Sequence, residues 1–219
     1  TFLLWLNENE LLQNVGKLKL IKAEIANIVP LSDVEVKILL NDFDNSYFGI
    51  RNKLMVMLML DSGLRRGEVV NLESKNIFMH NNTMLVQGKG EKERLVPFGE
   101  ETKRYINRYS HMRNEYEKRF FQKEDGTPIT DNTIKMYFQE LKESTGIIRL
   151  HPHLLRHTFA TNYILYGGDV EELRILLGHT SLQMTMKYVH LATQQRILNQ
   201  RYHSHIDKLF CQYDNKLAQ

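Results

Sequence analysis

Residues 151–157 of the chain read His-Pro-His-Leu-Leu-Arg-His, and the rest of the sequence can be organised around them. Proline fits the first position of a helix, so a helix is predicted to begin at Pro152. His153 and Arg156 then lie three residues apart on one face of that helix. An acid–base group beside a fixed cation is a suitable grip on a phosphate group.

The same stretch has two other interpretations. Taken alone, it is most simply an ordinary polar helix face. It also has the features of a metal site, because His153 and His157 have the i, i+4 spacing of zinc ligands. A third ligand would have to come from elsewhere, and the neighbouring Arg156 would oppose a bound cation, so a metal site is disfavoured.

Upstream, residues 62–68 read Ser-Gly-Leu-Arg-Arg-Gly-Glu. The first glycine permits a tight approach into a following helix. Arg65 is expected at the N-terminal end of that helix, where the helix favours anions. Glu68, one turn later, is placed to hold an arginine or a histidine. Taken alone, a helix start with two solvated arginines would be the simpler explanation.

Short apolar runs at residues 77–79, 84–86 and 94–96 predict three antiparallel strands. The turn before the last run, residues 88–93, reads Gly-Lys-Gly-Glu-Lys-Glu and places Lys89 at a hairpin tip. A flexible lysine in this position suits proton donation or phosphate contact. Hairpin tips are usually just solvated, so this stretch alone is a weak indication.

Leu177-Gly178-His179 is followed, nine residues after the histidine, by Tyr188. A tyrosine hydroxyl is a poor nucleophile at its free pKa near 10, so it would need neighbouring cations or a base. Most tyrosines are structural, and this chain has ten.

Outside the predicted sheet the sequence patterns are helical. Ser32 and Glu35 form a capping-box pattern, a hydroxyl followed three residues later by a carboxylate, which predicts a helix start. The segment Phe48–Leu60 is apolar nearly all round and is expected to be a buried helix with its three methionines in the core. The predicted fold is mainly α with a small three-stranded antiparallel β-sheet (α+β). The other expected helices cover about residues 33–43, 66–73, 101–121, 131–144, 152–166, 170–177, 182–189 and 194–210.

In their order and spacing, these stretches resemble the tyrosine recombinase (phage integrase) family, most closely its Xer-type recombinases and the integrases of phages and mobile elements. That family carries a Thr/Ser-Gly-Leu-Arg-x-x-Glu box and a Gly-Lys-Gly hairpin followed by Arg-x-Val-Pro. It also carries a Pro-His-x-Leu-Arg-His box and a Leu-Gly-His box with a tyrosine nine residues later. Each stands here, at residues 62–68, 88–97, 152–157 and 177–188. The resemblance covers about residues 31–190, with no departure at a catalytic position.

The resemblance implies a tyrosine recombinase catalytic fold and a site-specific DNA recombinase or integrase. Such an enzyme cleaves and rejoins DNA through a 3′-phosphotyrosyl intermediate, formed here at Tyr188. The resemblance further implies that Arg65 and Arg156 clamp the non-bridging phosphate oxygens, where charge grows in the transition state. Lys89 is expected to protonate the leaving 5′-oxygen.

For the remaining site residues, the resemblance gives His153 an acid–base role toward Tyr188 and gives His179 a hydrogen bond to the phosphate. Glu68 is expected to orient its neighbours. The cationic side chains do the work that a metal would do, so no metal ion, no cofactor and no ATP are expected.

The resemblance also divides the chain. Residues 1–14 are expected to end the family's N-terminal core-binding domain, residues 15–30 to form a linker, residues 31–191 to form the catalytic domain, and residues 192–219 to form a C-terminal helix and tail. The chain starts without Met inside a segment with helical spacing, which suggests a piece of a longer protein.

Double-stranded DNA is the expected partner. The family works as a homo-tetramer on two duplexes, with accessory directionality proteins or host DNA-bending proteins as further partners. The C-terminal segment is long enough to dock on a neighbouring subunit, which is favoured, or to fold back on its own domain.

Composition is compatible with this interpretation. A chain of 219 residues, 42% hydrophobic and 25% charged, fits one large globular domain or one domain and part of another. The net charge of +3 is only a weak indication of a nucleic-acid partner. The single cysteine, Cys211, favours a reducing compartment, and no apolar run approaches the roughly 20 residues that cross a bilayer. A cytoplasmic, nucleoid-associated enzyme without membrane contact is therefore expected.

Three rival functions share some of these features. A type IB topoisomerase has the same fold and constellation but relaxes supercoils, and the Leu-Gly-His box at this spacing favours the recombinase. A DNA-binding module without catalysis is disfavoured by six intact catalytic positions. A metal-binding regulatory domain built on the clustered histidines is disfavoured for the reasons given above.

Overall fold

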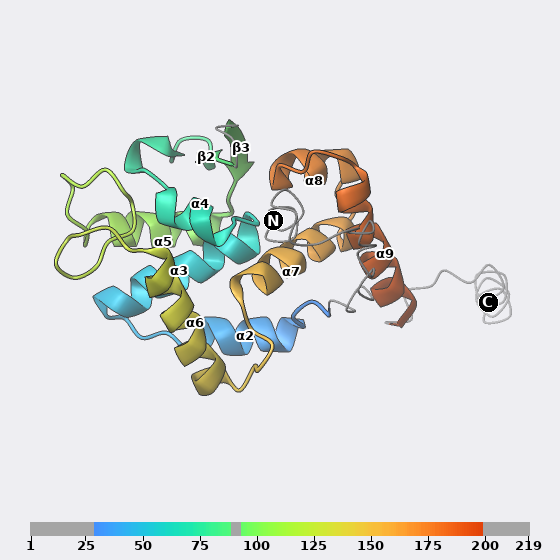
Figure 1. Cartoon of the computed structure of the whole chain (residues 1–219), viewed down its shortest axis with the longest axis horizontal. Helices are drawn as coiled ribbons and strands as arrows, with labels where there is room; N and C mark the ends of the chain where they lie inside the picture. Colours follow the sequence, from blue (N-terminus) through green and yellow to red (C-terminus); the bar gives the residue numbers. More distant parts are fainter. Residues whose placement is uncertain (1–28, 89–92, 199–219) are drawn as a thin grey trace, which may run out of the picture.

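The computed structural model describes residues 29–88 and 93–198 (Figure 1). Strands β1 (Ile77–Phe78), β2 (Thr83–Gln87) and β3 (Glu93–Pro97) form one antiparallel sheet in that order. The remaining elements are α-helices and one short 3₁₀ helix, so the prediction of a mainly helical fold with a small sheet is confirmed. The helices are α2 (Asp33–Asn41), α3 (Tyr47–Asp61), α4 (Arg66–Asn71), η1 (Ser74–Asn76), α5 (Glu100–Ser110), α6 (Asp131–Thr145), α7 (Pro152–Leu165), α8 (Val170–Leu177) and α9 (Gln183–Leu198).

Local sequence signals set several of these boundaries. The capping box at the start of α2 is present: the Glu35 carboxylate accepts the Ser32 backbone N–H at 2.8 Å, and the Ser32 hydroxyl accepts the Glu35 N–H at 3.3 Å. Pro152 occupies the first turn of α7, as predicted. The apolar helix α3 is buried along most of its length, and its three methionines lie in the core, as predicted.

Buried apolar side chains form two clusters, and α7 contributes to both. Its N-terminal half, with Leu154 and Leu155, packs into the larger cluster with α2 to α6 and the sheet. Its C-terminal half packs into the smaller cluster with α8 and α9, which lie together at one end of the molecule (Figure 1). Helix α7 therefore joins the α8–α9 end to the rest of the protein. The smaller cluster consists of Phe159, Ala160, Ile164, Leu173, Leu177, Tyr188 and Ala192.

The expectation of one helix over residues 101–121 is wrong, because α5 ends at Ser110. Side chains beyond that point hydrogen-bond to the backbone of the following segment and hold it in an irregular path. The Arg113 guanidinium donates to the carbonyls of Glu117, Arg119 and Phe120, and the Gln122 amide donates to the Asn114 carbonyl. Such side-chain partners compete with the helical backbone pattern.

The expectation of two separate helices over residues 182–189 and 194–210 is also wrong, because α9 is continuous from Gln183 to Leu198. Ala192 is fully buried in the smaller cluster, so packing against α7 holds the helix across the expected break. Arg196 donates to the carbonyls of Ile164 and Leu165 at the C-terminal end of α7. The expected domain boundary at residues 191 and 192 falls inside this helix, and residues 199–210 lie outside the described residues.

Candidate active site

Glu68 is the hub of a network of two arginines. Its carboxylate accepts hydrogen bonds from the backbone N–H and from Nη1 of Arg65, each at 2.8 Å, and from Nη1 and Nη2 of Arg94 at 2.8 and 2.9 Å. Burial of Glu68 acts to raise the pKa of its carboxyl group, but the bonds from Arg94 and Arg65 outweigh that effect and lower the pKa. Glu68 is therefore a buried anion bound to two cations.

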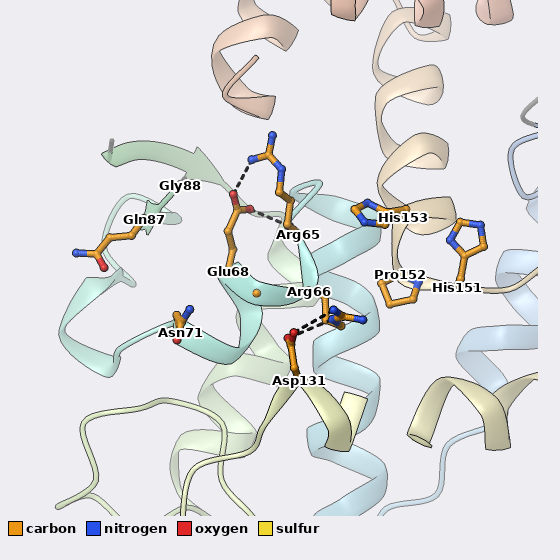
Figure 2. A pocket seen from close by; sticks show the side chains of 11 residues that line it. Arg65, Arg66, Glu68, Asn71, Gln87, Gly88, Asp131, His151, Pro152 and His153 are labelled. Atoms are coloured by element: carbon orange, nitrogen blue, oxygen red, sulfur yellow. Dashed lines mark hydrogen bonds and ion pairs between the residues drawn. The ribbon is translucent and has the colours of Figure 1, made fainter. Parts of the chain in front are cut away.

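A pocket of about 550 Å³ opens beside this network. Arg65 reaches it with a side chain that remains 34% exposed. Figure 2 shows His153 projecting from α7 toward Arg65, and shows Arg66 paired with Asp131. Burial, and then the charges of Arg156 and Arg66, lower the pKa of His153, so its imidazole is favoured in the neutral form. The pocket thus combines a partly exposed guanidinium with a neutral imidazole.

Arg156 lies in α7 and is almost fully buried. It donates from Nη1 to the Gly63 carbonyl at 2.6 Å and from Nη2 to the Leu177 carbonyl at 2.5 Å. Burial, and then the charge of Arg65, lower the pKa of Arg156 to about 9. The guanidinium therefore binds two loops of the site together and keeps its positive charge at neutral pH.

Tyr188 lies in α9 with a side chain that is only 1% exposed, and its hydroxyl is 2.8 Å from Nδ1 of His157. Burial raises the pKa of Tyr188 to about 12, against the opposing charges of Arg156 and Arg65. Burial, and then the charge of Lys187, lower the pKa of His157 to about 4. The phenol is therefore protonated and the imidazole neutral, and the hydroxyl donates its hydrogen bond to Nδ1 in the tautomer that carries the imidazole proton on Nε2.

His179 stacks on the nucleophile candidate. Its ring is parallel to the Tyr188 ring within 14°, with centroids 6.3 Å apart, and its Nδ1 lies 2.9 Å from the Thr185 hydroxyl. Burial, and then the charges of Arg156 and Arg65, lower the pKa of His179 to about 4. The segment just after α8 therefore places a second neutral imidazole beside Tyr188.

The structure brings together all the predicted site residues that it describes. Arg65, Glu68 and His153 line the pocket. His179 lies beside the buried Tyr188, and Arg156 binds the end of α8 that precedes His179. Lys89, the remaining predicted residue, lies outside the described residues. The six that are described are Arg65, Glu68, His153, Arg156, His179 and Tyr188.

Sequence reasoning missed two residues of this site. In the sequence, His157 stands out only as a possible metal ligand and as the last residue of the Pro-His-x-Leu-Arg-His box, whereas in the structure it is the hydrogen-bond partner of Tyr188. Its position four residues after His153 on a helix that carries Arg156 was the available signal. Arg94 was quoted only as part of the hairpin motif, and nothing in the sequence indicated that it would reach Glu68 across 26 residues.

Two further observations concern the described ranges alone. No helix within residues 29–88 and 93–198 has the length and apolar character needed to cross a membrane. The same part of the chain contains no group of three or more His, Cys, Asp or Glu side chains arranged to hold a metal ion.

Comparisons with known proteins identify the family of this chain. The profile of the phage integrase family matches residues 30–195. Tyrosine recombinase XerC of Staphylococcus epidermidis is 36% identical over 155 residues, which cover 67% of this chain and 51% of that protein. The chain thus spans about half the length of the curated relatives it matches.

Two solved structures share the fold. XerA recombinase superposes with a TM-score of 0.70 at 28% identity, over 80% of this chain and 66% of that one. XerH site-specific recombinase, solved bound to a palindromic difH substrate in a post-cleavage complex, superposes with a TM-score of 0.66 at 22% identity, over 77% of this chain and 51% of that one. With a family match over residues 30–195, this chain belongs to the phage integrase family of tyrosine recombinases.

Proposed function

We propose that this chain is the catalytic part of a site-specific DNA recombinase that cleaves and rejoins DNA through a phosphotyrosine at Tyr188. The observation that carries the proposal is the hydrogen bond from the Tyr188 hydroxyl to His157, beside Arg156 and the pocket that Arg65 lines. A phenol held by an imidazole next to fixed cations has the parts that an activated oxygen nucleophile needs.

In the proposed reaction, Tyr188 Oη attacks a DNA phosphorus, and the bond from phosphorus to the 5′-oxygen breaks. The DNA 3′-phosphate stays on the tyrosine, and Lys89 supplies a proton to the leaving 5′-oxygen. Arg65 and Arg156 stabilise the charge that grows on the non-bridging oxygens, and His179 donates a hydrogen bond to one of them. Attack by another 5′-hydroxyl reverses the step and joins new partners. The bond energy stays in the phosphotyrosine, so ATP is not needed.

The proton of Tyr188 passes to an imidazole as the new bond forms. The sequence pattern favoured His153 as this acid–base group, whereas the hydrogen bond favours His157. His153 lies at the pocket beside Arg65, where it would contact the phosphate itself. We therefore assign the first proton transfer to His157 and keep His153 as a phosphate-side acid–base group.

Tyr188 must move before it reacts, because a phosphate cannot approach a side chain that is 1% exposed. The chain between α8 and α9 is short, from Gly178 to Leu182, so a shift at the start of α9 would expose the phenol. DNA binding in the pocket would supply the energy for that shift. We thus propose that Tyr188 is buried and unreactive in the free protein.

Duplex DNA is the proposed substrate, and a homo-tetramer on two duplexes is the proposed working assembly. XerH, which shares the fold, was solved on its DNA substrate. The exposed apolar side chains of Ile197 and Leu198 at the end of α9 are compatible with docking of the C-terminal segment on a neighbouring subunit. Accessory directionality or DNA-bending proteins and a cytoplasmic, nucleoid-associated location are part of the same proposal.

Covalent capture tests this function. The protein as its gene encodes it is incubated with random-sequence duplexes that carry a nick, so that cleavage releases a short fragment and traps the adduct. The DNA that stays attached to the protein after denaturation is recovered and defines the site. The covalent adduct should form equally well in excess EDTA. Adducts that require added Mg²⁺ or Zn²⁺ would contradict the proposed mechanism, and relaxation of supercoils without joining of partner sites would indicate a topoisomerase.

A further inference from the structure

Arg94 carries a second set of contacts that the proposed reaction does not use. It lies in β3 with a side chain that is 8% exposed. Nη1 and Nη2 bind the two carboxylate oxygens of Glu68 in parallel, and Nε donates to the Leu176 carbonyl at 2.6 Å. All three nitrogens of the guanidinium are therefore engaged, in the planar fork geometry that arginine alone provides.

Through Glu68, Arg94 is connected to Arg65. Glu68 holds Arg65 at two points, the backbone N–H and Nη1, with the same two oxygens that Arg94 binds. A carboxylate with four donors in a buried setting has little freedom to turn. The position of the Arg65 guanidinium at the pocket is thus fixed through Glu68 by Arg94.

Through its bond to the Leu176 carbonyl, Arg94 is also connected to the segment that carries His179. Helix α8 ends at Leu177, and Gly178 follows in the left-handed conformation with φ of 61°. Carbonyls in the last turn of a helix lack partners within the helix, and here Leu176 receives Arg94 while Leu177 receives Arg156. A Cβ at Gly178 would lie 3.3 Å from Cδ of Arg94, so the side chain packs directly against the turn that leads into His179.

We propose that Arg94 is a positioning residue that fixes the spacing between Arg65 and His179, by binding Glu68 on one side and the C-terminal end of α8 on the other. This inference rests on the proposed function, because those two residues would contact the same phosphate. All three guanidinium nitrogens of Arg94 are bound to protein acceptors, and the side chain does not line the pocket, so it is not placed to contact DNA. Its loss should therefore slow the chemical step without weakening DNA binding.

Arg94→Lys is the informative variant. A lysine keeps the positive charge beside Glu68, so the fold survives, but a single ammonium cannot bind both carboxylate oxygens and the Leu176 carbonyl in one plane. Arg149→Lys is the matched control, because Arg149 binds both oxygens of Glu35 and the Pro30 carbonyl away from the site. Both variants lose the same kind of fork.

The experiment measures the rate of adduct formation on the captured site, the Kd for that DNA at fixed salt, and the melting temperature. Misplacement of catalytic groups by about 1 Å costs on the order of 10²-fold in rate. We expect Arg94→Lys to lose about that factor with a Kd within about threefold of the unsubstituted protein, and Arg149→Lys to keep its rate. In the double variant, we expect the loss of rate to be at least about threefold smaller than the product of the losses in Arg94→Lys and Arg65→Ala, because Arg94 acts partly through Arg65.

Three results would overturn the inference: a normal rate for Arg94→Lys, a loss of DNA affinity as large as its loss of rate, or an equal loss of rate in Arg149→Lys. The proposed function has a separate test in the unsubstituted protein. If that protein forms no adduct, the function and the inference both fall. If it forms one and Arg94→Lys matches its rate, the inference alone falls.

Discussion

The hydroxyl of Tyr188 lies within hydrogen-bond distance of Nδ1 of His157, at 2.8 Å, with the phenol fully buried and the imidazole partly buried. Their pKa values, about 12 for the phenol and about 4 for the imidazole, place the proton firmly on the tyrosine. Full proton transfer before attack is therefore very unfavourable. The transfer is expected to accompany formation of the bond from oxygen to phosphorus, when the phenolic oxygen becomes acidic.

Replacement of His157 should slow cleavage. In His157→Gln the side chain no longer accepts the Tyr188 proton, and general acid–base assistance is worth roughly 10²–10⁴-fold. Single-turnover adduct formation would measure this loss, with His111→Gln, on the exposed end of α5, as a control that keeps its rate. If His153→Gln formed the adduct slowly and His157→Gln formed it at the normal rate, His153 would instead be the general base.

Acid should destabilise the fold earlier than carboxylate protonation alone would. His157 and His179 have pKa values lowered from 6.5 to about 4, so both stay neutral in the folded state while the unfolded chain takes up protons below about pH 6.5. Their contribution to stability is complete above pH 6.5 and is lost as the pH falls toward 4. Urea unfolding across this range should show a falling free energy of unfolding, with a shallower slope in His179→Gln. A free energy that stays constant from pH 6.5 to 4.5 would contradict the burial of these two imidazoles.

Gly63→Ala should destabilise the protein strongly. Gly63 has φ of 64°, and a Cβ there would lie 2.4 Å from Cδ1 of Phe159 in the smaller core cluster. The left-handed backbone and the overlap together should cost about 2–4 kcal/mol. Gly67→Ala is the control: nothing lies within 4 Å of its Cβ position inside α4, so it should be neutral or stabilising by up to about 1 kcal/mol. Equal melting temperatures for the two variants would show that Gly63 is not constrained as described.

Lys89→Ala should slow cleavage of ordinary DNA far more than cleavage of DNA with a 5′-bridging phosphorothiolate. An alkoxide leaves badly unless it is protonated as the bond breaks, whereas a thiolate leaves well without a proton. The expected gap is roughly 10²–10⁴-fold. Arg65→Ala should slow both substrates, because it acts on the non-bridging oxygens. If the phosphorothiolate substrate restored cleavage by His153→Ala but not by Lys89→Ala, His153 would be the general acid.

Most of the fold was predictable because its signals are local. The capping box at Ser32, the proline at the start of α7 and the apolar run of α3 each set an element from a few adjacent residues. The predicted helix boundaries were wrong where contacts between residues distant in sequence determine them. Helix α5 ends because Arg113 and Gln122 bind the backbone of the next segment, and α9 continues because Ala192 is buried against α7.

Fixed motif spacings identify the candidate site as a set of residues, but they do not give its geometry. Spacing along α7 could not show that His157 rather than His153 faces Tyr188. Nor could it show that Arg94 connects Glu68 to the end of α8, since those contacts join β3 to two separate helices. Hydrogen bonds between distant elements depend on tertiary packing, which the sequence pattern does not encode locally.

The most direct test of the account is to locate the covalent bond to DNA. Protein captured on its nicked site is digested, and the peptide that carries the DNA remnant is sequenced by mass spectrometry. We expect a 3′-phosphate linked to Tyr188, and we expect Tyr188→Phe to form no adduct while it binds the same DNA with nearly unchanged affinity, since only the hydroxyl is lost. An adduct on any other residue, or one that persists in Tyr188→Phe, would contradict the account.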